Sequence, residues 1–113
     1  MFDVKQAEED LVASIKYLED HDWLQLRQWD GKGNCCAFGA ILLATGDSRV
    51  DIHFRERSSN VCRVWYRVTG KEITGYNDMP GRTKAEVLDK FREVLDALRA
   101  DPDRAMGKEP RRG

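Results

Sequence analysis

The feature that most constrains the fold is the apolar segment CCAFGAILLAT, residues 35–45, in a chain whose residues are 35% charged. A helix built from it has no polar face to turn toward solvent, so we expect it to run through the centre of the domain. Asn34 is placed to cap this helix and Gly46 to end it. Gly39 costs about 1 kcal/mol relative to alanine in a helix. Close approach of a neighbouring helix, or of a tryptophan from the preceding segment, would offset that cost.

The N-terminal segment, residues 4–20, has the pattern of an amphipathic helix. Asp3 is placed to cap it, with Gln6 returning the bond, and Asp22 to end it in a left-handed conformation, which aspartate tolerates better than most residues. The apolar positions recur at helical spacing and are Val4, Ala7, Leu11, Ile15 and Leu18.

A second amphipathic helix follows the stretch YNDMPGRT, residues 76–83. Asn-Asp and Pro-Gly are turn signals, and Thr83 with Glu86 three residues later forms a capping box. The apolar face then comprises Val87, Leu88, Phe91, Val94, Leu95 and Leu98. Asp101-Pro102 ends the helix, and we expect residues 101–113 to form a flexible tail.

Three segments between these helices leave alternatives open. Residues 23–34 form either an extended arm or a short β-hairpin, with the glycines of DGKGN supplying the turn. Residues 48–57 fit a strand, a loop or a short helix. Residues 59–69 carry a helical stripe, with Ser58 or Ser59 as cap and Gly70 as stop, but their β-propensity also fits a strand.

Together these patterns predict a mainly α fold. We expect a small single domain, residues 1–100, built as a bundle of about four helices, with a short β-hairpin or an extended arm as an addition. A length of 113 residues suits one domain with one modest core. The formal net charge of −1 gives no bulk electrostatic reason to expect nucleic acid or an anionic membrane.

The cysteines and the N-terminus indicate the compartment. Cys35 and Cys36 are neighbours that can hardly bridge each other, and the odd total of three cysteines fits a reducing environment. The N-terminus, MFDVKQAEEDL, is acidic and lacks the apolar region of a signal peptide. The longest apolar run is about half of what a bilayer requires. We therefore expect a cytoplasmic protein that is not bound to a membrane.

Four short segments resemble the marks of one family. They are DWLQ (residues 22–25), CAFGAI (36–41), YNDMPGRT (76–83) and the Glu86-Val87 pair. The chain is similar, over roughly residues 8 to 98, to the small bacterial and phage proteins of domain-of-unknown-function family 6197. Asp, Ile and Tyr at positions 22, 41 and 76 replace the family's usual Gly, Leu and Trp, and these changes keep the fold. The resemblance implies a fold and no particular activity.

A cysteine-dependent enzyme is one functional alternative. A helix dipole lowers the pKa of a thiol in the first turn, and Cys36, His53 and Asn77 follow the chain order of papain-like enzymes. The helix is almost wholly apolar, however, and free cysteine is among the most buried residue types, so a core cysteine is favoured. We expect no cofactor. We expect no metal site either, because the cysteines and histidines lack zinc-binding spacing.

A nucleic-acid-binding module is a second alternative. Arg63 and Arg67, four residues apart, would form a stripe beside Trp65 on a helix. The nearly neutral chain has no recognition motif, so nucleic acid is not the expected partner.

The Asn-Asp pair has two interpretations. In the functional one, Asp78 is a general base or a ligand and Arg82 clamps an anion. In the structural one, Asn77 or Asp78 forms an Asx-turn, and Arg82 reaches back to Asp78 or to carbonyls of the N-terminal helix. We favour the structural interpretation because it accounts for every residue at its spacing.

The aromatic content favours a protein-binding role. A core of this size need not bury all the large aromatics, and exposed aromatics often anchor interfaces. The interaction candidates are Trp23, Trp29, Arg63, Trp65, Arg67, Tyr76 and Arg82, with Tyr66 a further aromatic. We therefore predict a non-enzymatic accessory module that binds another protein. The phage members of the resembling family suggest a host protein, and the oligomeric state is left open.

Overall fold

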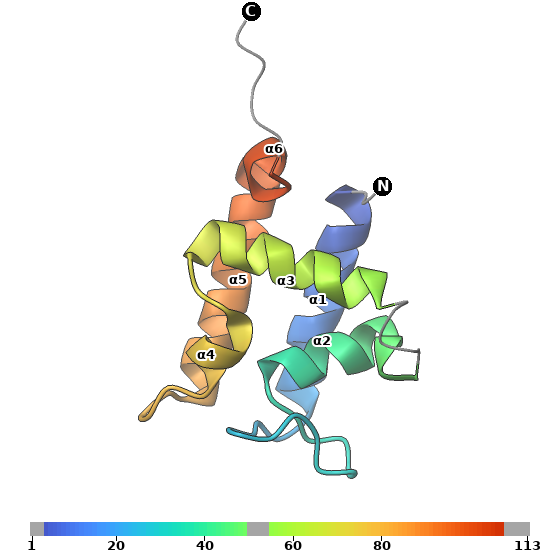
Figure 1. Ribbon diagram of the computed structural model, residues 1–113, viewed down its shortest axis with the longest axis vertical. Coiled ribbons are helices and arrows are strands. Elements are labelled where there is room, and N and C mark those ends of the chain that lie inside the picture. The colour runs from blue at the N-terminus through green and yellow to red at the C-terminus, as the bar shows by residue number, and fades with distance from the viewer. Residues whose placement is uncertain (1–3, 50–54, 108–113) are drawn as a thin grey trace, which may run out of the picture.

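The computed structural model of the chain describes residues 4–49 and 55–107, and their secondary structure is helical, without a sheet (Figure 1). The elements are α1 (Val4–Asp20), α2 (Ala37–Thr45), the 3-10 helix η1 (Asp47–Arg49), α3 (Glu56–Thr69), α4 (Ile73–Asn77), α5 (Lys84–Ala100) and α6 (Pro102–Ala105). The predicted mainly α fold is confirmed. The expected Asp3 cap and His53 lie outside the described residues.

The long helices α1 and α5 run side by side; α3 crosses both of them, and α2 crosses α1 on the same face (Figure 1). The short helix α4 packs against α2 and α3. Trp65 of α3 lies in the core, with its ring edge-to-face with Phe91 at 5.0 Å and with Tyr76 at 5.8 Å between centroids. Its indole N–H has no hydrogen-bond partner within the described part of the chain. Contact with two other aromatic rings offsets the cost of that unpaired donor.

The apolar segment forms the predicted central helix, but the helix begins later than expected. The predicted Asn34 cap is wrong: Cys36 is the N-cap, and its thiol accepts a hydrogen bond from the Gly39 amide at 3.4 Å. The Asn34 side chain does not cap the helix because its Oδ1 accepts a hydrogen bond from the Asp22 amide at 3.0 Å. Gly46 ends the helix at φ +81°, as predicted.

Close approach at Gly39 is also confirmed, although the neighbour differs from the expectation. A Cβ at Gly39 would lie 2.1 Å from the carbonyl oxygen of Gln28. That carbonyl also accepts a hydrogen bond from the Cys36 amide at 3.3 Å. The backbone of the preceding segment therefore lies directly on α2, where we had expected a helix or a tryptophan.

Residues 21–36, which we call the arm, contain bends and isolated bridges but no regular strand. Both predicted forms are present in part, because the antiparallel bridge between Trp29 and Cys35 closes the DGKGN turn as a minimal hairpin, with a bond from the Asp30 amide to the Asn34 carbonyl at 3.2 Å. Isolated bridges pair Cys35 with Trp23 and with Trp29. The expectation that Asp22 adopts a left-handed conformation is wrong, because α1 ends at Asp20 and Leu26 is the non-glycine residue with a positive φ among those described. The Asp22 carbonyl instead accepts from the Cys35 amide at 3.2 Å, which holds residue 22 in the bridged arm.

The open alternative for residues 59–69 is decided in favour of a helix, α3. Burial of one face of α3 at Val61, Val64 and Trp65 overrides the β-propensity. The predicted serine cap is wrong because the helix begins earlier, at Glu56, after an N-cap without a side-chain bond. The Asp47 carboxylate caps it from a distance, accepting from the Ser58 amide at 2.7 Å. Gly70 ends the helix at φ +72°.

Two short helices were not expected from the sequence. Helix α4 buries Ile73 and Tyr76, and its five residues are too few to show a helical period. Helix α6 lies inside the segment expected to be a flexible tail. The Asp101 side chain caps it at the Arg104 amide at 3.3 Å, and Ala105 is buried. The part of the chain from 102 to 105 therefore belongs to the folded domain.

Candidate functional site

Asn77, at the end of α4, is buried and uses its whole side-chain amide. Its Oδ1 accepts from the Trp23 indole Nε1 at 2.6 Å and from the Ala37 amide at 2.9 Å. Its Nδ2 donates to the Leu24 carbonyl at 3.0 Å and to the Asp78 carboxylate at 2.9 Å. Because indole and amide N–H groups can only donate, these partners settle the orientation of the amide. Asn77 thus joins the arm, the start of α2 and the end of α4.

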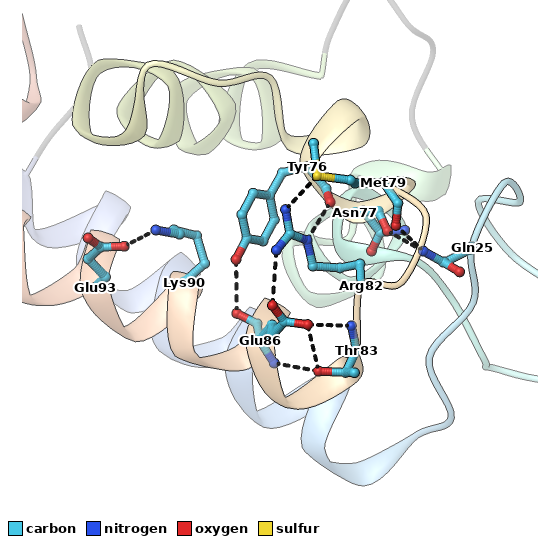
Figure 2. A network of polar contacts seen from close by, with 9 residues as sticks. All are labelled: Gln25, Tyr76, Asn77, Met79, Arg82, Thr83, Glu86, Lys90 and Glu93. Atoms are coloured by element: carbon cyan, nitrogen blue, oxygen red, sulfur yellow. Dashed lines mark hydrogen bonds and ion pairs between the residues drawn. The ribbon is translucent and has the colours of Figure 1, made fainter.

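Gln25 and Asp78 fasten the same part of the arm. Gln25 Nε2 donates to the carbonyls of Asn77 at 3.1 Å and Met79 at 2.9 Å (Figure 2). Asp78 Oδ1 accepts from the Leu26 amide at 2.9 Å. The predicted Asx-turn is therefore wrong in its partners, because these side chains bond to a segment more than fifty residues away. The Asn77-Asp78 pair still has a structural role, but this role comes from hydrogen bonds to the arm and not from a local turn.

Further bonds hold the rest of the arm. The Asp30 carboxylate accepts from the amides of Lys32 at 2.8 Å and Asn34 at 3.2 Å, and Gly31 and Gly33 have positive φ as the turn requires. The Lys32 amide bond, followed by bonds from Asn34, lowers the pKa of Asp30. At the other side of this turn, the Tyr17 hydroxyl donates to the Gly33 carbonyl at 2.9 Å. The arm is therefore held to the domain at both its ends.

Arg82 contacts groups that were not predicted (Figure 2). Its Nε donates to the Tyr76 carbonyl at 3.0 Å, its Nη1 to Glu86 at 3.1 Å, and its guanidinium carbon lies 3.7 Å from the Tyr76 ring centroid. The expected bond from Arg82 to Asp78 or to α1 is wrong, because the tight turn aims the side chain back over the Tyr76 ring. Only 12% of the Arg82 side chain is exposed, and both it and Asp78 are engaged with the protein's own groups.

The predicted capping box at the start of α5 is confirmed. Thr83 Oγ1 accepts from the Glu86 amide at 3.2 Å, and Glu86 Oε1 accepts from the Thr83 amide at 3.0 Å (Figure 2). Hydrogen bonds from the Thr83 side chain and backbone, followed by the bond from Arg82, lower the pKa of Glu86.

The candidate cysteine, Cys36, is buried at the start of α2. Cys36 is 5% exposed, and burial raises its pKa, which is opposite to the lowering expected from the helix dipole. Burial also raises the pKa of Cys35 and of Cys62 to about 12. The structure does not place Cys36 relative to His53. Within residues 4–49 and 55–107, no group of three or more His, Cys, Asp or Glu side chains is arranged to hold a metal ion.

The aromatic interaction candidates divide between core and surface. Trp65 and Tyr76 are 0% and 7% exposed, so these two side chains lie in the core, where the Trp65 ring packs edge-to-face against Phe91 and Tyr76. Trp23 is half-buried, with its indole N–H bonded to Asn77. Trp29 is 52% exposed and remains a candidate.

Two more exposed apolar side chains lie in the arm and in the turn after α4, where that turn is bonded to the arm. Leu26 is 82% exposed and Met79 is 48% exposed, and Gln25 and Asp78 join their backbones. We call Leu26, Trp29 and Met79 the arm surface. Leu26 and Met79 could not be found from the sequence, because a leucine in WLQLRQW and a methionine in a turn give no sign of exposure.

Two of the grooves on the described surface contain interaction candidates from the sequence. The Trp29 groove has a volume of about 270 Å³. It is lined by Gln28, Trp29, Gly39, Leu42, Leu43, Ser48, Arg49 and Arg55. The α3–α4 groove, of about 570 Å³, contains the predicted candidates Arg63 and Arg67. Its other lining residues are Phe38, Cys62, Tyr66, Glu72, Ile73 and Thr74, so an acidic side chain lies beside the two arginines.

Comparison with known proteins agrees with the resemblance. The model of DUF6197, a family of unknown function, matches residues 3–97. The chain therefore belongs to this family. No curated protein and no solved structure matches it. Within the described residues, no helix has both the length and the apolar character needed to cross a membrane.

The four segments that carry the family resemblance meet at this site. Trp23 and Gln25 of the first, Ala37 of the second, and Asn77 of the third form one network of hydrogen bonds. Glu86 of the fourth is joined to it through Arg82. The four family segments, although far apart in the sequence, therefore form one hydrogen-bond network that positions the arm.

Proposed function

We propose that the protein is a non-enzymatic cytoplasmic accessory module that docks on another protein through the arm surface, Leu26, Trp29 and Met79. The observation that carries this proposal is the conformation of Leu26. It has φ +60° and is 82% exposed. A left-handed conformation costs a non-glycine residue about 1–2 kcal/mol. The Leu26 side chain is exposed, so it gains no burial energy within the described chain that would offset this cost.

The strain at Leu26 is maintained by the surrounding bonds. Asp78 holds the Leu26 amide, and Asn77 and Gln25 hold the residues before it. Strained residues that a structure over-determines cluster at ligand clamps and similar functional positions. An exposed leucine and tryptophan on a backbone held in this way lose little conformational entropy on binding, which favours affinity. A cytoplasmic location is supported by the three cysteines, all of which are free.

The test is quantitative pull-down with mass spectrometry from a lysate of the organism that encodes the protein. The baits are the wild type, Leu26→Asn, Trp29→Ser and the control Val12→Ser. Val12 is 44% exposed on α1, outside the arm, so its variant removes exposed apolar surface without changing the arm. We expect a specific set of proteins to be captured by the wild type and the Val12 variant and lost with both arm variants. Equal capture by all four baits contradicts the proposal.

A further inference from the structure

We infer that the Trp29 groove binds an acidic polypeptide segment of the partner, with one large apolar side chain of that segment inserted beside Trp29. This inference rests on the proposed function, because it names the chemistry of what docks there. It is carried by the shape of the groove, by the rigidity of its wall and by the charge of its rim.

The shape suits one anchoring side chain. The groove lies between the arm, α2 and η1, with Leu42 and Leu43 of α2 as its apolar part and Trp29 as a wall. Its volume of about 270 Å³ lies below the range of about 300–1,000 Å³ that is typical of small-molecule pockets. A single apolar side chain of a larger partner fits this space better than a complete small ligand.

The wall beside Trp29 is rigid because the arm lies directly on α2. The Gln28 carbonyl occupies the place that a side chain at residue 39 would fill, and it accepts from the Cys36 amide. Trp29 itself is bridged to Cys35, which is fully buried. The tryptophan ring is therefore presented from a backbone that is already ordered before a partner arrives.

The described part of the rim carries positive charge. Arg49 and Arg55 line the groove, and none of the described residues that line it is acidic. Arg49 is exposed, and its side chain makes no hydrogen bond or ion pair with another described residue. Guanidinium groups pair with carboxylates through bidentate hydrogen bonds, so aspartate or glutamate beside the apolar anchor complements this rim. The chain as a whole has a net charge of −1, so the attraction is local to the groove.

A nucleic acid would need a different surface. Phosphate binding draws on many basic groups along a backbone, whereas this rim has two arginines around an apolar floor. The observations therefore favour a peptide, and binding of an oligonucleotide is an outcome that the experiment must test.

The experiment is selection of a phage-displayed random dodecapeptide library on the full-length wild type, Trp29→Ser, Arg49→Glu and Val12→Ser. We expect the wild type and the Val12 variant to enrich peptides in which Asp or Glu flanks a large apolar residue. The Trp29 variant should lose this enrichment. A synthetic peptide from the enriched pool should bind Arg49→Glu at least about tenfold more weakly, as measured by fluorescence polarisation. Replacement of its acidic residues by lysine should restore binding to that variant.

Three outcomes overturn this inference. Enriched peptides that need Trp29 but carry no acidic bias would leave the proposed function standing and remove the charge complementarity. Enrichment that is indifferent to Trp29 would contradict both proposals. Displacement of the bound peptide by oligothymidylate at equal concentration would assign the groove to nucleic acid. Circular dichroism of each variant must match that of the wild type, and Arg49→Glu is suited to this because residue 49 is exposed.

Discussion

At the scale of single residues, Asn77 shows how one side chain decides a long-range contact, and Leu26 shows how other residues hold a strained backbone. Asn77 satisfies an indole, a backbone amide and a carbonyl that would all be left unpaired in its absence. An unpaired buried polar group costs about 1–3 kcal/mol, so this one amide affects the stability of the whole arm. Leu26 differs from Asn77 in that other residues hold it, because Asp78 accepts the hydrogen bond of its backbone amide.

Replacement of Asn77 by aspartate should destabilise the protein by about 3 kcal/mol. The substitution keeps the shape but turns a donor into an oxygen that faces the Leu24 carbonyl and the Asp78 carboxylate. Trp23→Phe is the control, since it removes one donor and leaves Oδ1 its bond from Ala37, and it should cost about 1 kcal/mol. Urea unfolding measures both. Equal small losses would show that the network carries little stability.

Replacement of Leu26 by asparagine should leave the free energy of unfolding unchanged or raise it by up to about 1 kcal/mol, since asparagine tolerates positive φ better than leucine. Leu26→Ala, which keeps a β-carbon and the strain, should give no such gain. Thermal unfolding of the three proteins makes the comparison. A marked loss of stability in the asparagine variant would mean that Leu26 has a structural role, which would weaken its assignment as a docking residue.

At the scale of elements, the start of a helix can be predicted from the sequence only when nearby residues accept the hydrogen bonds of its first amides. When distant residues accept them, the local sequence does not show where the helix begins. The start of α5 is closed locally by Thr83 and Glu86, and the sequence predicts it correctly. The starts of α2 and α3 involve Asn77 and Asp47, which accept the Ala37 and Ser58 amides from distant positions. Local signals placed both of these starts wrongly for that reason.

The capping box of α5 should make stability depend on pH. The folded-state pKa of Glu86 lies below its ordinary value, so its contribution is fully present above the unfolded pKa of about 4.3 and is lost as pH falls through the lower folded pKa. The stability difference between the wild type and Glu86→Gln should therefore shrink on acidification below about pH 4. Urea unfolding over this range tests it. Glu93→Gln, which alters another exposed glutamate of α5, is the control. A difference that is constant with pH would contradict the prediction.

The contact between the arm and α2 should make Gly39 intolerant of a side chain. Gly39→Ala places a Cβ 2.1 Å from the Gln28 carbonyl oxygen, and we expect a net loss of about 2 kcal/mol as the arm is displaced. Gly75→Ala in α4 is the matched control, because no atom lies within 4 Å of its Cβ and alanine favours a helix by about 0.5–1 kcal/mol. Denaturant unfolding compares them, and the tryptophan fluorescence of the folded protein, to which Trp29 contributes, should shift only in the first. Similar stabilities would show that the arm can move freely.

At the scale of the whole molecule, the core shared by α1, α2, α3 and α5 decides which reactive groups are accessible. Cys35 is fully buried and Cys36 nearly so, whereas Cys62 is half-buried and lines the α3–α4 groove. The shared core therefore shields the adjacent thiols while the domain is folded.

In a Cys62→Ser variant, iodoacetamide at about pH 8 should label the adjacent cysteines only when the domain unfolds. Burial keeps both thiols protonated, and the pKa of Cys35 is about 12. The labelling rate should rise with urea in parallel with the loss of helical circular dichroism. Rapid labelling of the folded variant, with a thiolate titrating near neutral pH, would contradict this and revive the enzyme alternative built on Cys36.

Much of the fold was accessible from sequence because amphipathic periods, glycine stops and a local capping box act over a few residues. They correctly predicted α1, α5, the buried α2 and the ends at Gly46 and Gly70. Periodicity could not say which aromatics are exposed, because Trp29 and Trp65 look alike until the core is assembled. The site was harder to predict than the fold, because the sequence indicated several of its residues but not the groups to which they bond.

The sequence by itself determined which segments are helical and which short segments belong together as family marks, because helix formation depends on residues three and four positions apart. Only the tertiary structure decided what those marks do. Asn77 finds Trp23 and Ala37 at separations of 54 and 40 residues, and Asp78, its neighbour, holds the amide of Leu26, whose φ is positive, from a separation of 52 residues. A buried amide must be satisfied by whatever packing brings within reach, and packing is a property of the assembled chain.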